Sequence, residues 1–310
     1  MKFLVGYSND SSGKDALKLG VALAEMTQGK LIVCHIVAKT WHNIALAKFD
    51  EDYDQFLCDE AQKALDDAKL AVPSHIEARY IARTALSISE GLKQTAKELS
   101  VDCMVISGAR IAIKGQFFSG TVADELLNQL SLPVALAPKG FAKNQGFTSP
   151  LTRLSCAVSG SDQSCNLAIS AGEWAEIFNV PLRFVTFAVR DRDITPTAAG
   201  FDAENMVINE WREQIEAEYA QATQHWESDV PISLEIGDGP TWKESIQSID
   251  WQASELLIVG TTTSGIFKQV LVGKNAEKLF VMLPFQGWFF LDRQIKADST
   301  TYQKEYEILE

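Results

Sequence analysis

A repeat of roughly 150 residues constrains this chain more than any other feature of its sequence. Three pairs of positions mark the repeat, each pair lying in the same local pattern: Ser8 and Ser159, Gly108 and Gly260, and Gly120 and Gly273. Their offsets are 159 − 8 = 151, 260 − 108 = 152 and 273 − 120 = 153, so the register drifts by only two residues. Because self-similarity at a fixed period indicates repeated structural units, the sequence predicts two copies of one domain in tandem.

Each copy alternates apolar, strand-like runs with helical patterns. We expect strands near 2–7, 30–37, 75–82, 102–107 and 133–137, and again near 153–158, 181–188, 231–236, 255–259 and 287–291. The expected helices lie near 14–28, 52–71, 85–99 and 121–131, then near 167–178 and 203–228. Strands that alternate with helices form parallel sheets with right-handed crossovers. The predicted fold class is therefore α/β, with two tandem, doubly wound, five-stranded parallel-sheet domains.

The predicted domains cover residues 1–140 and 152–291, with a linker that contains glycine and proline between them. The polar residues 292–310 belong to neither copy and are expected to form a C-terminal tail. The length of 310 residues fits this division, because a typical domain has roughly 100–200 residues.

The charge balance limits the classes of partner. The formal net charge is −13, and such a field repels nucleic acid and anionic membrane surfaces. No apolar run reaches the length of about 18 residues that crosses a bilayer, and the N-terminal stretch does not develop into a signal peptide. We therefore expect a cytoplasmic protein that binds neither nucleic acid nor membrane.

Motifs for catalysis or metal binding are absent from the sequence. It contains no H-E-x-x-H, C-x-x-C or G-x-S-x-G pattern. The segment around Lys274 is not a P-loop, because Lys268 stands where that loop requires its first glycine. His35 and His75 fall in expected strands, where a structural imidazole is the simpler interpretation than a general base. The sequence thus predicts a protein that is not an enzyme and has no metal cofactor.

Three further patterns have structural interpretations. The five cysteines are odd in number and widely spaced, so we expect buried free thiols. The acidic run at 50–54 is expected to lie at the positive end of a helix. An aromatic stripe follows helical spacing along 203–228 and predicts a core or domain interface: Trp211, Ile215, Tyr219, Ala222 and Trp226.

Short motifs in both copies resemble those of the universal stress protein family. Ser159-Gly160-Ser161 follows the first strand of the second copy, with a weaker Ser8-Asn9-Asp10 in the first. Cys34-His35-Ile36-Val37 ends the second strand, and Gly237-Asp238-Gly239-Pro240 follows the third strand of the second copy. The family's most diagnostic motif is G-x2-G-x9-G-(S/T), which Gly108, Gly120 and Thr121 match in part. The resemblance covers residues 1–138 and 152–291.

The resemblance implies a binding site for ATP or AMP, because glycines let the backbone approach phosphates and a helix N-terminus binds anions. In the first domain it points to eight residues: Gly6, Tyr7, Ser8, Ile36, Gly108, Gly120, Thr121 and Val122. Ile36 would offer its backbone to adenine, and residues 120–122 would hold phosphates. In the second domain the candidates are Ser159, Gly160, Gly260, Gly273 and Lys274.

Several departures from the family pattern affect this site. Ile111 replaces the middle glycine in the first domain, and the spacer there is one residue shorter. Thr263 and Lys274 replace the middle glycine and the terminal serine in the second. The aspartate that many nucleotide-binding members carry at the positions of Ser8 and Ser159 is missing, although Asp10 lies nearby.

The resemblance also implies a stress-response role and a pseudo-dimer of the two domains within one chain. Since an exposed edge strand needs a partner, the last strands of the copies, 133–137 and 287–291, are expected to pair. A homodimer and protein partners are further expectations. Two functions stay open: regulation by an adenine nucleotide, or a nucleotide-free structural or adaptor role. Weak ATP hydrolysis has the least support, because no base or metal-binding carboxylate is identifiable.

Overall fold

A computed structural model of the chain describes residues 1–38, 47–108, 120–130, 132–143, 151–158, 162–189, 200–223, 226, 228–252, 254–261 and 288–293. The first half contains β1 (Lys2–Gly6), α1 (Ser11–Thr27), β2 (Lys30–Ala38), α2 (Ala47–Ala71), β3 (Ala78–Ala85), α3 (Ile88–Leu99), β4 (Cys103–Ser107), α4 (Thr121–Gln129), β5 (Val134–Ala137) and η2 (Phe141–Lys143). The second half contains β6 (Arg153–Ala157), α5 (Asp162–Phe178), β7 (Leu182–Val189), α6 (Gly200–Thr223), β8 (Ile232–Gly239), α7 (Trp242–Gln247), β9 (Glu255–Thr261) and β10 (Trp288–Arg293).

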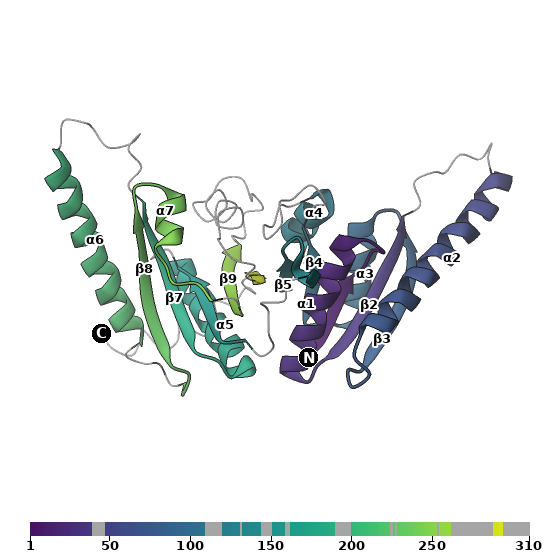
Figure 1. Ribbon diagram of the computed structural model, residues 1–310, viewed down its shortest axis with the longest axis horizontal. Helices are drawn as coiled ribbons and strands as arrows, with labels where there is room; N and C mark the ends of the chain where they lie inside the picture. Colours follow the sequence, from purple (N-terminus) through teal and green to yellow (C-terminus); the bar gives the residue numbers. More distant parts are fainter. Residues whose placement is uncertain are drawn as a thin grey trace, which may run out of the picture.

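All strands belong to one ten-stranded sheet with the order β3-β2-β1-β4-β5-β10-β9-β6-β7-β8 (Figure 1). Pairing within each half is parallel, whereas β10 pairs with β5 in the antiparallel direction, with Phe290 opposite Ala135. The predicted α/β class with parallel sheets in two tandem units is confirmed. The expected pairing of the two last strands is also confirmed, and it makes the halves one continuous sheet.

The helices begin and end at residues that satisfy their terminal groups. Asp10, Ser87 and Thr241 cap α1, α3 and α7 by accepting a hydrogen bond from a backbone N–H in the first turn. Gln28 and Ser100 end α1 and α3 in the left-handed conformation, where glycine is more usual. Their backbone N–H groups donate to the last carbonyls of the helices, which stabilises these ends without glycine.

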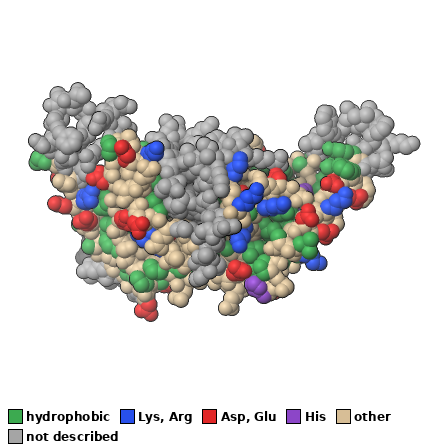
Figure 2. Space-filling model, viewed as in Figure 1, with side chains coloured by type: hydrophobic (Ala, Val, Ile, Leu, Met, Phe, Trp, Pro, Cys, Tyr) green, Lys and Arg blue, Asp and Glu red, His purple; other side chains and the backbone are tan. Residues whose placement is uncertain are grey.

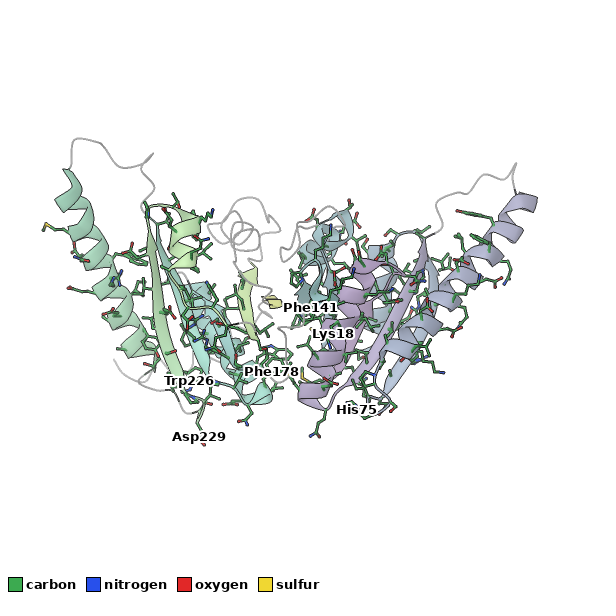
Figure 3. All side chains as sticks on the ribbon, in the orientation of Figure 1. Lys18, His75, Phe141, Phe178, Trp226 and Asp229 are labelled. Carbon is green, nitrogen blue, oxygen red and sulfur yellow. The ribbon has the colours of Figure 1, made fainter. Side chains whose placement is uncertain are left out.

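The two faces of the sheet carry separate cores, and each core is continuous across the two halves. On one face Phe3 and Val5 belong to the same cluster as Leu154 and Trp174; on the other Leu4 belongs with Val185 and Leu257. Phe141 is fully buried where the first half ends (Figure 3). Burial of such side chains on both faces is typical of parallel sheets covered by helices.

A buried carboxylate attaches the start of the linker to α1. Asp15 accepts hydrogen bonds from the backbone N–H groups of Gly140 (2.8 Å) and Ala142 (2.7 Å) and is almost completely buried. Gly140 has a positive φ of 83°, a conformation that glycine adopts without strain. Burial raises the pKa of Asp15, and the two backbone donors partly offset that rise.

Four expectations from the sequence are wrong in detail. β3 begins at Ala78 because Ile76 N donates to Pro73 O in a turn, so His75 lies in that turn and not in a strand. α6 ends at Thr223, so Trp226 lies beyond the helix. Cys58 is exposed on α2, unlike Cys34, Cys103 and Cys156, which are buried. β10 continues to Arg293, two residues into the expected tail.

Candidate functional site

The strand order places a topological switch point at the carboxyl ends of β1 and β4. From β1 the chain moves outward to β2 and β3, and then returns to the other side of β1 for β4 and β5. The connections from β1 to β2 and from β4 to β5 therefore lead to opposite sides of the sheet. In open α/β sheets the crevice at such a switch point is where ligands bind. Five of the eight predicted first-domain residues flank it directly: Gly6, Tyr7, Ser8, Gly108 and Gly120.

The turn between β1 and α1 is closed by its own hydrogen bonds. Asp10 accepts from Ser8 Oγ at 2.9 Å and from Gly13 N at 3.0 Å. The fit is tight, because a Cβ on Gly13 would lie 1.9 Å from the Ser8 carbonyl oxygen. Asp10 is therefore the cap of α1, and this use of its carboxylate competes with a role as substitute for the missing family aspartate.

The backbone groups of Ile36 point to the side of β2 on which β1 lies. Lys30 N donates to Met1 O and Tyr7 N donates to Cys34 O at 2.9 Å, so alternate residues of β2 direct their polar groups toward β1. By the same alternation Ile36 directs its backbone groups to that side, beyond the end of β1 at Gly6. Its side chain is buried in the core and leaves only the backbone for a ligand.

The N-terminus of α4 lies after β4 and has no side-chain cap among the residues that the structure describes. Gly120 is its N-cap residue with φ −105° and ψ 174°, an extended conformation, and makes no side-chain cap hydrogen bond. Thr121 is exposed and Val122 partly exposed. The first amides of a helix bind anions, although Asp124 in the first turn adds a negative charge. Ile111 lies in 109–119, outside the described residues.

A polar cluster that the sequence analysis missed lies beside this crevice. Tyr7 is buried, and burial first, then the charges of Asp67 and Asp10, raise its pKa. Asn9 Nδ2 donates to Asp67 Oδ2 at 3.2 Å, which connects the β1–α1 turn to α2. Burial lowers the pKa of His35, whose Nδ1 atom is buried without a hydrogen-bond partner among the described residues. No motif could have indicated Asp67, because its position depends on how α2 packs.

The second-domain site is described at one residue only. Ser159, Gly160, Gly273 and Lys274 lie outside the described residues. Gly260 was expected to end a strand and open a loop, but it lies inside β9 and pairs with Asp292 of β10. A Cβ there would lie 3.1 Å from Leu167 of α5, so packing of the helix on the strand accounts for this glycine.

The described part of the chain contains neither a metal-binding cluster nor a membrane-spanning helix. No group of three or more His, Cys, Asp or Glu side chains there could hold a metal ion. No helix there is both long and apolar enough to cross a membrane.

Comparisons with known proteins cover both halves of the chain. The universal stress protein family profile matches residues 1–138. Universal stress proteins of Mycobacterium tuberculosis and Mycobacterium bovis are each 29% identical to this chain over 287 residues, which cover 92% of this chain and 97% of theirs. The chain is therefore similar to universal stress proteins along nearly all of its length, and its first half matches the family profile. Because the alignment with these relatives spans nearly all of both chains, it includes both halves of the repeat.

Solved structures agree with this similarity at the level of the fold. A universal stress protein from Archaeoglobus fulgidus has a TM-score of 0.59 at 14% identity, over 95% of this chain and 97% of that one. A putative universal stress protein from Pseudomonas aeruginosa has a TM-score of 0.50 at 17% identity, over 94% and 92% of the two chains. The chain therefore shares the overall fold of these structures.

Proposed function

We propose that this protein is a non-catalytic, cytoplasmic stress-response protein of the universal stress protein family, regulated by an adenine nucleotide, ATP or AMP, in its first domain. The observation that carries the proposal is the N-terminus of α4, which lies at the switch point without a side-chain cap. Uncapped amides and the Thr121 hydroxyl can donate to phosphate oxygens. On the other side of β1, the backbone of Ile36 is available to the base.

The proposed arrangement uses residues of the first domain only. Gly6 and Gly108 lie at the ends of β1 and β4, Tyr7 and Ser8 form the wall after β1, and residues 120–122 form the anion site. We propose that the ligand changes the affinity for protein partners, and that the protein forms homodimers.

The domain boundaries that fit this proposal are 1–140 and 152–293. The second domain is extended by two residues because Asp292 and Arg293 pair with β9.

Calorimetric titration with ATP, after mass spectrometry of small molecules released on denaturation, tests the proposal. Gly120→Val should weaken ATP binding by roughly 100-fold, because a β-branched side chain blocks backbone approach. Gly120 has extended φ and ψ angles that valine also adopts, so the variant should keep the fold.

Thr121 supplies a matched pair of variants on an exposed position. Thr121→Val removes only the hydroxyl and should weaken binding by roughly fivefold, the worth of about one hydrogen bond. Thr121→Ser keeps the hydroxyl and should bind ATP like the parent protein. Absence of any heat at millimolar ATP, with no nucleotide released, would reject the nucleotide role.

That result would favour a nucleotide-free adaptor that acts through protein contacts. One observation supports this second candidate: Asp10 serves as the cap of α1, so one acidic group near the crevice is already used in the fold.

A further inference from the structure

A groove lies between α6 and the edge strand β8, in the second domain and away from the proposed nucleotide site. Its volume is about 630 Å³, within the range of roughly 300–1,000 Å³ typical of ligand sites. One wall is a single stripe of α6 formed by Arg212, Glu216 and Tyr219. The other wall is the unbroken run 232–236 of β8. Because consecutive residues line it, the groove follows the outer backbone edge of the strand.

The backbone of β8 directs its polar groups into this groove at every second residue. Leu182 N donates to Pro231 O at 2.9 Å, and Leu182 is the register partner of Ile232. In a parallel ladder Pro231 and Ser233 therefore point toward β7, whereas Ile232, Leu234 and Ile236 point away from it. Asp238 N follows the same alternation, because it donates to Ser248 Oγ at 3.0 Å and not to β7. An edge of this kind is a template for another strand.

The groove exists because aromatic side chains separate α6 from the sheet. Phe184 of β7 contacts Tyr219 and Trp226 edge to face, with ring centroids 6.0 and 6.4 Å apart. In the first half the buried side chains of the corresponding helix α2 are mostly small: Ala61, Ala64 and Ala68, with Leu65 as a larger one. In Figure 1 both α6 and α2 diverge from the sheet toward their upper ends.

The rim of the groove is acidic. α6 contains six acidic residues and one basic residue, Arg212, in the sequence GFDAENMVINEWREQIEAEYAQAT. Arg212 pairs with Asp238 at 3.3 Å. Glu210, Glu213 and Glu216 are exposed, and Figure 2 shows acidic side chains on the α6 side of the molecule. With a net charge of −13 on the chain, a second copy would be repelled here, whereas a basic segment would be attracted.

We propose that the groove between α6 and β8 binds an extended, basic segment of a partner protein, which adds to the sheet as an eleventh strand at β8. Main-chain hydrogen bonds to Ile232, Leu234 and Ile236 supply sequence-tolerant affinity. Glu216, in the wall of the groove, selects for basic side chains. The protein would thereby have a partner site in the second domain that does not depend on nucleotide.

The test uses the full chain and a fluorescent peptide, acetyl-Lys-Val-Thr-Val-Lys-Val-Thr-Val-Lys-amide. Fluorescence anisotropy should show saturable binding, and hydrogen exchange should slow at the amides of Ile232, Leu234 and Ile236. Only alternate amides of an added strand face the protein. N-methylation of one alternate set of peptide residues should therefore abolish binding, while N-methylation of the other set should leave the affinity within about twofold.

Two exposed glutamates on α6 give a matched pair of protein variants. Glu216→Lys, in the wall of the groove, should weaken peptide binding by roughly fivefold, whereas Glu213→Lys, outside the wall, should change it less than about twofold. Three results would each overturn the proposal. They are no saturable binding, equal binding of both N-methylated peptides, and concentration-dependent self-association of the chain that Glu216→Lys alters, which would make a second copy the occupant.

Discussion

Two buried polar residues of the second half, one of them charged, occupy positions that are apolar in the first half. Ser155 and Arg183 are register partners, as are Leu4 and Ile32, which stand 151 residues earlier. Arg183 is buried and pairs with Glu255 at 2.6 Å, with Ser155 Oγ at 3.0 Å and with Glu235. A buried charge left without its partner is costly. Identical folds therefore do not require similar core chemistry.

The titration of His35 belongs to the same residue scale. Burial lowers its pKa below that of the unfolded chain, so its contribution to stability is fully present above about pH 6.5 and is lost as the pH falls through the folded-state pKa. His35→Gln removes this titration. Between pH 7.5 and 5.0 the parent protein should lose more free energy of unfolding than the variant does, as measured by urea denaturation. Equal losses would contradict the burial of a neutral imidazole.

Single residues of the site were only partly predictable from the sequence. The glycines and Ile36 could be placed because they follow or end apolar runs. Asp10 could be noted as a neighbour, but its use as a helix cap depends on where α1 begins, one residue later. Cys58 lies in a part of α2, residues 53 to 60, in which none of the described side chains is buried. These residues lie within a regular helix, so the sequence pattern gave no sign of this exposure.

At the scale of elements, one glycine determines how α5 and the segment after α6 fit together. A Cβ on Gly172 would lie 2.5 Å from Cη2 of Trp226, whose ring also packs against Phe184.

The strand positions were predictable because apolar runs mark them. The ends of β3 and α6 were not, because the turn at Pro73 and the exit of Trp226 from the helix depend on tertiary packing.

Gly172→Ala tests this contact, and the two competing effects have opposite signs. Alanine favours an isolated helix over glycine by about 1 kcal/mol, whereas overpacking against Trp226 should cost about 1–3 kcal/mol. We expect net destabilisation, measured as a lower urea midpoint. In the background Trp226→Phe, whose smaller ring makes room, the same substitution should become neutral or stabilising. Net stabilisation in the parent background would show that the ring moves freely.

At the scale of the whole molecule, the junction between β5 and β10 covers an edge in each half. Antiparallel pairs join Phe289 to Leu136, Phe290 to Ala135 and Leu291 to Val134. Both cores continue across the junction. This pairing was predictable because the family resemblance implies a pseudo-dimer and because both last strands would otherwise be exposed edges.

A fragment of residues 1–143 should therefore pair with itself. It keeps η2, whose backbone binds Asp15, but exposes the edge of β5 that β10 covers in the full chain. Sedimentation should give about twice the monomer mass, because an uncovered edge recruits another strand. The full chain at the same concentration is the control for association through other surfaces. A fragment that stays monomeric at every concentration would show that the β5 edge needs no partner.

The covalent connection of the halves also changes what each is free to become. In a dimer of identical chains, every substitution at a two-fold interface appears twice, so both copies must tolerate it. Here the antiparallel junction forms within one molecule, and dilution does not separate it. Each half can therefore acquire changes that its counterpart never has to accommodate. The charged interior around Arg183 and the open groove beside β8 are two such asymmetries, and both lie in the same half.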